Sequence, residues 1–182
     1  MDVIQLRKVS KSFGTLRAVD DLSLAVPRGC IYGFIGPNGS GKTTTLRMLM
    51  SILRPDTGEV EVLGECNPPA AKDSVGYLPE ERGLYKKMKV RRLLRYYGKL
   101  KNADAGLDTR IDDWLDRMAL TDWADKMVET LSKGMAQKVQ FLSTIIAEPE
   151  IIVLDEPFSG LDPVNLEVLR EAVLTLRKNG AT

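Results

Sequence analysis

The stretch GPNGSGKTT at residues 36–44 decides the fold of this chain. It matches the pattern G-x-x-x-x-G-K-[ST], in which glycines let the backbone curl so that consecutive N–H groups point at a phosphate. The apolar run at residues 30–35 predicts a buried strand before the loop, and the spacing of leucine and methionine over residues 46–53 predicts a helix after it. The N-terminus of that helix would attract phosphate further. A strand, a glycine-rich loop and a helix in this order indicate a nucleotide-binding site rather than a chance glycine-rich turn.

The residues of this loop have the chemistry that phosphate binding needs. The ammonium group of Lys42 can reach the β- and γ-phosphates of a nucleotide, and the hydroxyl of Thr43 can ligate Mg²⁺. We expect the phosphates to contact the whole loop, namely Gly36, Pro37, Asn38, Gly39, Ser40, Gly41, Lys42, Thr43 and Thr44.

The composition is that of an ordinary soluble α/β domain. The 182 residues are enough to bury a core, and a net charge of +1 argues against a globally nucleic-acid-binding protein. The isolated Cys30 and Cys66 offer neither a disulfide framework nor metal-ligand spacing, so we expect a reducing, cytosolic setting. No apolar run is long enough to span a membrane, and the N-terminus lacks a signal-peptide pattern. Because the chain contains no histidine, histidine-metal sites and histidine catalysis within it are excluded.

Hydrophobic periodicity predicts strands in both parts of the chain that flank a helical region. Strand patterns occur at residues 2–9, 22–26, 59–63, 75–78 and 151–154. Helical spacing begins after residue 82, so residues 84–130 are predicted to form an all-helical insert. Asp162 and Pro163 suit the N-cap and first position of a final helix, which we expect to stop at Gly180.

The charge of this insert is uneven. Residues 82–101 carry nine Lys and Arg and no acid, whereas acids dominate from Asp104 to Glu129. Tyrosines at positions 85, 96 and 97 interleave with the basic residues, which is typical of a nucleic-acid-binding surface. A solvated helix face explains the same pattern and is favoured, because the basic run is short and apolar residues occupy the other face. Contact with a partner at an anionic membrane surface is a third interpretation.

Two carboxylates follow the apolar run at residues 151–154. Ligands in α/β proteins bind at the carboxyl ends of strands, so Asp155 suits coordination of Mg²⁺, directly or through water. Glu156 could orient or deprotonate the water that attacks a γ-phosphate. An acidic N-cap after a core strand would explain an isolated Asp-Glu pair. The phosphate loop in the same chain favours the catalytic interpretation.

Over its full 182 residues the sequence resembles the nucleotide-binding subunit of an ATP-binding cassette (ABC) transporter. The family's landmarks occur in order. Phe13 matches an aromatic residue that stacks on adenine, although taken alone it would more often be a core residue. Residues 131–135 read LSKGM where the family signature is typically LSGGQ, and SGLD at residues 159–162 matches the loop that crosses the family's dimer interface.

The resemblance implies a fold and a domain organisation. The fold is α/β, a P-loop NTPase core with an N-terminal antiparallel β portion and an all-helical insert, truncated at its C-terminal part. Residues 1–182 would form a single ABC ATPase domain. Its catalytic core would comprise residues 1–83 and 131–182, and its helical subdomain residues 84–130.

The resemblance also implies a function. The chain would bind and hydrolyse Mg-ATP as the cytoplasmic motor subunit of a membrane transporter, at the inner face of the cell membrane. Its partners would be integral membrane permease subunits and a second copy or a paralogous ATPase subunit, and no nucleic acid is expected. Residues 80–85 resemble those of bacterial export-type subunits, including sodium and drug exporters, so export is the expected direction.

Family roles transfer to matching positions of this chain. Lys42 and Glu156 would act in catalysis, and Ser132 and Gly134 would act in trans on ATP bound to the other subunit. The metal would be held by Thr43, Asp155 and Glu80. Three residues depart from the family pattern: Glu80 replaces a glutamine, Lys133 a glycine and Met135 a glutamine.

A histidine that contacts the γ-phosphate in the family has no counterpart here. It normally lies on a strand after the last helix, whereas this chain ends at residues 180–182, so we expect a truncated domain that binds ATP but hydrolyses it poorly. A non-transport ATPase acting on ribosomes or DNA is an alternative, less favoured because no second cassette or coiled-coil insertion occurs. A regulatory module that senses ATP without hydrolysing it is the other alternative, which the three departures would favour.

Overall fold

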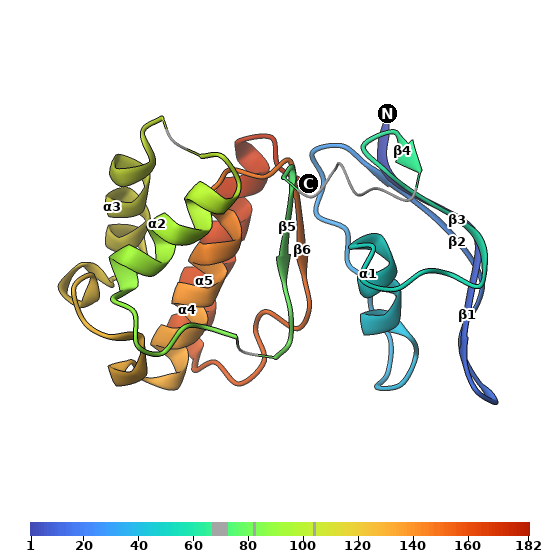
Figure 1. The fold of residues 1–182 in the computed structure, drawn as a ribbon, viewed down its shortest axis with the longest axis horizontal. Coiled ribbons are helices and arrows are strands. Elements are labelled where there is room, and N and C mark those ends of the chain that lie inside the picture. The colour runs from blue at the N-terminus through green and yellow to red at the C-terminus, as the bar shows by residue number, and fades with distance from the viewer. Residues whose placement is uncertain (67–72, 82, 104) are drawn as a thin grey trace. The chain divides into compact units, whose positions relative to one another are not determined.

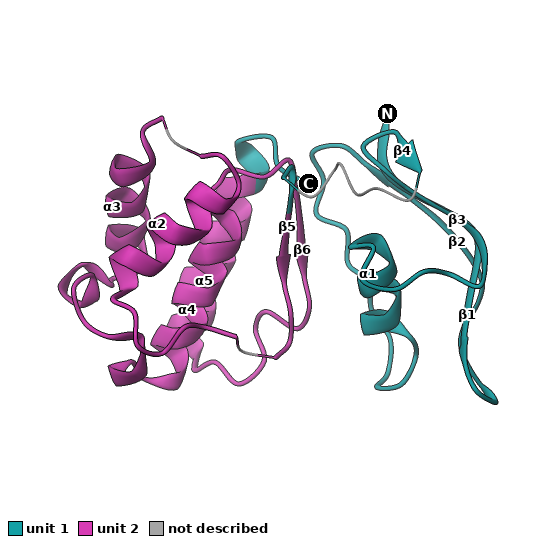
Figure 2. Cartoon of the chain, in the orientation of Figure 1, with its two compact units in different colours: residues 1–75, 177–182 teal, residues 76–176 magenta. Residues whose placement is uncertain are grey.

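The computed structural model describes residues 1–66, 73–81, 83–103 and 105–182 (Figure 1). The chain divides into two compact units, coloured separately in Figure 2. Unit 1 comprises residues 1–75 and 177–182, and unit 2 comprises residues 76–176.

Unit 1 is built on a four-stranded sheet with the strand order β2-β1-β3-β4. Every neighbouring pair in it is antiparallel. The strands are β1 (Asp2–Phe13), β2 (Leu16–Pro27), β3 (Thr57–Val62) and β4 (Glu65–Cys66). Leu6 lies opposite both Leu24 and Val60, and its side chain is almost completely buried. The alternation read from the sequence therefore fixes which face of this sheet is apolar.

Helix α1 (Lys42–Leu49) follows the phosphate loop, as predicted, and buries Thr45 and Met48. The predicted strand at residues 30–35 is wrong, because these residues have no regular structure and are mostly exposed. A strand forms only where a neighbour completes its hydrogen bonds, and no described strand of the sheet in unit 1 pairs with this run. The apolar composition of residues 30–35 does not reveal whether a neighbouring strand is available to pair with them.

Strands β5 (Val75–Leu78) and β6 (Ile151–Leu154) form a two-stranded sheet, and both lie at the predicted positions. Apart from Val75, this sheet belongs to unit 2. The backbone N–H of Asp155 donates to the carbonyl of Leu78 at 2.9 Å. The carboxyl ends of the two strands therefore lie side by side, and the loops that follow them leave from the same edge.

The regular elements in the rest of unit 2 are helices. In the described part of residues 84–130 they occur with no strand, as predicted, and one isolated antiparallel bridge joins Lys89 and Met127. The long helices are α2 (Val90–Leu100), α3 (Leu107–Arg117), α4 (Lys133–Ile145) and α5 (Pro163–Lys178). Two short 3-10 helices, η2 (Thr121–Trp123) and η3 (Val128–Thr130), lie between α3 and α4. The core includes Leu94, Ile111, Phe141 and Leu142, all completely buried. Among the described residues, no helix combines the length and the apolar character that crossing a membrane requires.

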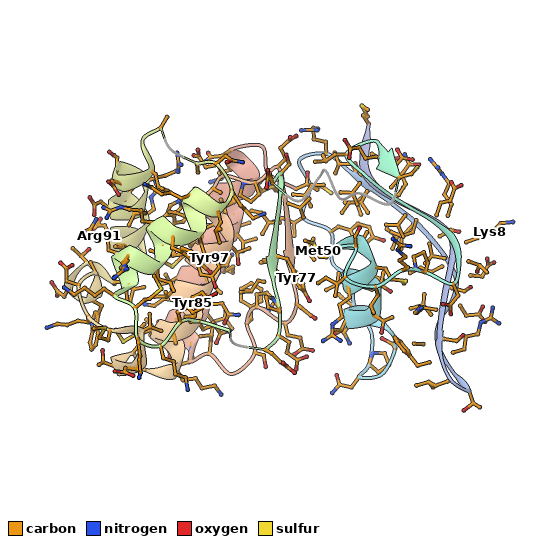
Figure 3. All side chains as sticks on the ribbon, viewed as in Figure 1. Lys8, Met50, Tyr77, Tyr85, Arg91 and Tyr97 are labelled. Atoms are coloured by element: carbon orange, nitrogen blue, oxygen red, sulfur yellow. The ribbon has the colours of Figure 1, made fainter. Side chains whose placement is uncertain are left out.

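The opposite charges of the insert meet within it. Arg91 of α2 forms an ion pair with Asp112 of α3, and Arg95 pairs with Asp108 at 2.8 Å. The three tyrosines pack on one another with ring centroids 5.6 to 6.5 Å apart, and Figure 3 shows Tyr85 close to Tyr97. Arg82 and Asp104 lie outside the described residues. These contacts support the interpretation of the charged run as a solvated helix face.

Candidate functional site

The phosphate loop in unit 1 is shaped by its glycines. Gly39 and Gly41 have φ of 82° and 87°, a left-handed conformation that disfavours other residues. A Cβ atom on Gly41 would lie 2.3 Å from the carbonyl oxygen of Ala18 on β2. Both the backbone conformation and the close approach therefore require glycine at position 41. The Gly41 carbonyl accepts the Thr45 N–H at 2.8 Å and the Thr45 hydroxyl at 2.9 Å, which fixes the start of α1.

The side chain of Lys42 folds over this loop. Its ammonium group donates to the carbonyl oxygens of Gly36 at 2.7 Å and Pro37 at 3.0 Å. The residues at the tip of the loop, 37–40, are exposed, so the loop is open to a ligand. Thr43, the second residue of α1, is half-buried. Unit 1 therefore brings together the predicted phosphate-binding residues on one loop and the helix N-terminus that follows it.

Phe13 lies at the end of β1 and is 47% exposed, so it is not a core residue. The Lys11 ammonium lies 5.8 Å from the centre of its ring. Asp56 holds this end of the strand: one carboxylate oxygen accepts from Lys11 at 2.6 Å and the other from the Ser12 N–H at 2.7 Å. These bonds, that of Lys11 first, lower the pKa of Asp56 below its ordinary value. An exposed aromatic ring at a strand end that is held by hydrogen bonds is suited to stack on a planar base.

Asp155, directly after β6 in unit 2, is 4% exposed. Its Oδ2 atom is buried and accepts no hydrogen bond from any residue that the structure describes. A buried carboxylate oxygen normally has a partner, because removing it from water is otherwise unfavourable. A divalent cation would supply that partner, so this residue fits a Mg²⁺ ligand. In the described parts of the chain no three acidic or cysteine side chains gather as a metal site, so most of the remaining ligands would be hydroxyl, water or phosphate oxygens.

Glu156 follows Asp155 with its side chain exposed and a backbone φ of 50°. This left-handed conformation is uncommon for a residue with a long side chain, and such residues concentrate at functional sites. The Glu156 carbonyl accepts the Ser159 N–H at 3.1 Å, which closes a turn. Glu80, the other acidic candidate in unit 2, is exposed on the loop after β5.

The segment 131–135 begins helix α4. Ser132 is its N-cap, and the Ser132 hydroxyl accepts the Met135 N–H at 3.3 Å. A Cβ atom on Gly134 would lie 3.0 Å from the side-chain nitrogen of Asn165 on α5. A Cβ atom on Gly160 would lie 3.0 Å from the Lys133 ammonium. The segments 131–135 and 159–162, distant in sequence, are therefore neighbours within unit 2.

Asp162 caps α5 as predicted. Its carboxylate accepts the Val164 N–H at 3.1 Å and the Asn165 N–H at 3.0 Å. The hydrogen bonds from the backbone and side chain of Asn165 lower the pKa of the Asp162 carboxyl. The cap fixes the direction in which the chain leaves the 159–162 turn.

Sequence reasoning missed two buried glutamines on α4. Gln137 and Gln140 are 8% and 7% exposed, and both donate hydrogen bonds to loop carbonyls. Together with the buried Thr144 they form a polar row at i, i+3 and i+7 on this helix. That spacing was a signal available in the sequence. Polar residues that share the apolar face of a helix are expected to form hydrogen bonds with groups in the protein interior.

The predicted site residues are thus divided between the two units. Unit 1 holds Phe13 and the phosphate loop, whereas unit 2 holds the remaining candidates: Glu80, Ser132, Gly134, Asp155 and Glu156.

Comparison with known proteins agrees with these features. The family model described as ABC transporter matches residues 19–159. The chain is 45% identical to the uncharacterized ABC transporter ATP-binding protein YhaQ of Bacillus subtilis strain 168, over 99% of this chain and 61% of that protein. It is 35% identical to the Nod factor export ATP-binding protein I of Cupriavidus pinatubonensis strain JMP 134, over 99% of this chain and 57% of that protein.

A solved structure, that of an ATP-binding subunit of an ABC transporter, superimposes with a TM-score of 0.90 at 26% identity, covering 98% of this chain and 76% of that one. The P-loop NTPase fold expected from the sequence, with its antiparallel β portion and helices, is confirmed by this likeness. The chain spans 56 to 65% of the length of the first three curated relatives.

Proposed function

The chain belongs to the ABC transporter family of ATP-binding proteins, and from that premise we propose that it binds and hydrolyses Mg-ATP as the motor subunit of a membrane transporter. The observation that carries the proposal is the buried Oδ2 of Asp155, which has no hydrogen-bond partner among the described residues, in a chain that also has a complete phosphate loop. A structural aspartate would have its oxygens satisfied, whereas one that ligates Mg²⁺ keeps an oxygen for the ion.

We assign the roles of the site residues by their chemistry. The loop N–H groups and the Lys42 ammonium bind the phosphates of ATP, and the exposed ring of Phe13 stacks on the base. Thr43, Asp155 and Glu80 hold Mg²⁺, which when bound neutralises charge on the phosphates. Glu156 orients the attacking water and accepts its proton. Positioning and charge neutralisation dominate this class of reaction, so few groups are needed.

Assembly is part of the proposal. Two ATPase subunits, either two copies or a copy with a paralogue, associate head to tail, and each contributes Ser132 and Gly134 to the ATP held by the other. Residues 1–83 and 131–182 act as the catalytic core and residues 84–130 as the helical subdomain of one domain. Integral membrane permease subunits bind this motor at the inner, cytoplasmic face of the membrane, and no nucleic acid takes part. The name of the Nod factor export relative supports export as the direction of transport.

Residues 1–182 on their own bind ATP but hydrolyse it slowly. In the family a histidine contacts the γ-phosphate, and this chain contains none. The absence of this histidine affects how the attacking water is positioned and does not affect the phosphate loop. The affinity for ATP is therefore retained.

The substitution Glu156→Gln tests the proposed reaction. It retains the size of the side chain but removes the base, so turnover of the full-length natural protein should fall by about 10²- to 10⁴-fold while ATP binding is unchanged. Steady-state phosphate release and equilibrium binding of labelled ATP measure the two quantities. Residues 1–182 alone, assayed in parallel, should turn over more slowly than the full-length natural protein.

Glu171→Gln, at an exposed position on α5, is the matched control and should hydrolyse ATP at the wild-type rate. Undiminished turnover in Glu156→Gln would rule out its role as the base. Wild-type protein that binds ATP without hydrolysing it would instead favour a regulatory module that senses ATP.

A further inference from the structure

Helix α4 carries a buried amide that the roles above do not use. Gln137 is 8% exposed, and its Nε2 donates to the carbonyl oxygens of Pro157 at 2.6 Å and Ser159 at 3.4 Å. Both acceptors belong to the turn that begins at Glu156. The side chain of Gln137 is therefore hydrogen-bonded to the backbone that directly follows Glu156, the proposed base.

The turn that begins at Glu156 needs such hydrogen bonds to hold its conformation. Glu156 has a φ of 50°, and residues held in so uncommon a conformation persist only where the surrounding structure fixes them. Glu156, Phe158, Ser159 and Gly160 are all exposed, so little packing holds them. Within the turn itself, the Ser159 N–H donates to the Glu156 carbonyl at 3.1 Å. The Gln137 amide supplies the connection from the turn to the helical core.

The same helix also holds the loop after β5. Gln140, nearly one turn beyond Gln137, donates its Nε2 to the carbonyl oxygen of Glu81 at 3.2 Å, next to Glu80. Ser132 caps the start of the helix. A single rigid element therefore connects the signature segment with both acidic loops of unit 2.

We propose that Gln137 is a positioning residue, which holds Glu156 in the backbone conformation that directs its carboxylate at the attacking water. This inference rests on the proposed function. Only a hydrogen-bond donor can fill the role, because both partners of the amide nitrogen are carbonyl oxygens. A neutral donor is also required if the charge near Asp155 is to be left unchanged.

Two substitutions distinguish the effect of the Gln137 hydrogen-bond donor from the effect of its side-chain volume. Gln137→Met keeps the volume but cannot donate, and Gln137→Glu can donate only when protonated. In the full-length natural protein at pH 8, both should lower kcat by roughly 10- to 100-fold. The KM for ATP should be unchanged, because the Gln137 amide holds the turn after the proposed base and has no proposed role in ATP binding. A glutamate buried beside carbonyl oxygens has a raised pKa, so the kcat of Gln137→Glu relative to wild type should recover as pH falls to 6. Gln137→Met should show no such recovery.

Gln5→Glu, at a position on β1 in unit 1, is the control and should follow the wild-type pH profile. Turnover of Gln137→Met at the wild-type rate, or a Gln137→Glu deficit that is the same at every pH, would overturn the inference. Hydrogen exchange of the Ser159 amide is a second measurement that needs no turnover. It should be faster in Gln137→Met than in wild type, and equal rates would also overturn the inference. A wild-type protein that hydrolyses no ATP would count against the proposed function alone, because the exchange measurement still tests Gln137.

Discussion

At the scale of single residues, positions with a left-handed backbone conformation are occupied by different residue types. The phosphate loop has glycine at positions 39 and 41, where the backbone itself is the proposed binding group. Position 156 has nearly the same class of backbone conformation but keeps a glutamate, although glycine would be less strained there. Lys8 and Glu148 have similar φ values of 50° and 54°, so the backbone at position 156 does not by itself assign a role. The proposed role of Glu156 as the base rests on its place directly after Asp155 at the end of β6.

The two loop glycines offer a matched test of packing against conformation. Gly39→Ala and Gly41→Ala both place a side chain in a left-handed conformation, at a cost of about 1 to 2 kcal/mol. Only the new methyl group at position 41 meets another atom, the Ala18 carbonyl oxygen at 2.3 Å. We therefore expect a lower urea midpoint for Gly41→Ala than for Gly39→Ala, measured without nucleotide by a probe in unit 1. Equal midpoints would show that β2 moves aside at little cost.

At the scale of elements, sequence periodicity succeeded where a segment finds its partners nearby. Helix α2 and strand β6 were predictable because their apolar residues alone fix a buried face. The run at residues 30–35 was not, because apolar side chains say that a segment tends to be buried and not which strand pairs with it. The roles of Gln137 and Gln140 also escaped prediction, since their acceptors are loop carbonyls that no sequence pattern locates. The chemistry of the loop and of Asp155 could be proposed from the sequence because motif spacing indicates it.

Helix α5 gives a prediction about its cap. The pKa of Asp162 is lowered in the folded protein, chiefly by hydrogen bonds from Asn165, so its carboxylate stabilises the fold above its ordinary pKa. That contribution is lost as the pH falls through the lowered value, in strongly acidic solution. Asp162→Ala should therefore lower Tm more at pH 7 than at pH 3, whereas Asp162→Asn, which can still cap, should lower it less at pH 7. Circular dichroism of α-helical signal against temperature measures both, and a Tm difference for Asp162→Ala that is independent of pH would contradict the assignment.

At the scale of the whole molecule, the chemistry is divided between the two compact units. The groups proposed to bind phosphate belong to unit 1, and the proposed carboxylates and the signature segment belong to unit 2. The proposed mechanism therefore needs contributions from both units, and the proposed exchange of Ser132 and Gly134 between subunits adds a second molecule. Two arginines of the basic run, Arg91 and Arg95, are paired with acids of α3, which supports the proposal that no nucleic acid takes part.

Complementation between two inactive variants tests this exchange of residues. Lys42→Ala removes phosphate binding, and Gly134→Asp places a negative charge in the signature segment, so each alone should be inactive. In a mixed dimer one composite site carries both changes and the other carries neither. Random mixing makes half of the dimers mixed, so an equal mixture should recover about a quarter of the wild-type ATPase rate if the sites act independently. Far-UV circular dichroism verifies that both variants are folded. For sites that act independently, a mixture as inactive as its components would show that Gly134 acts on the ATP of its own subunit.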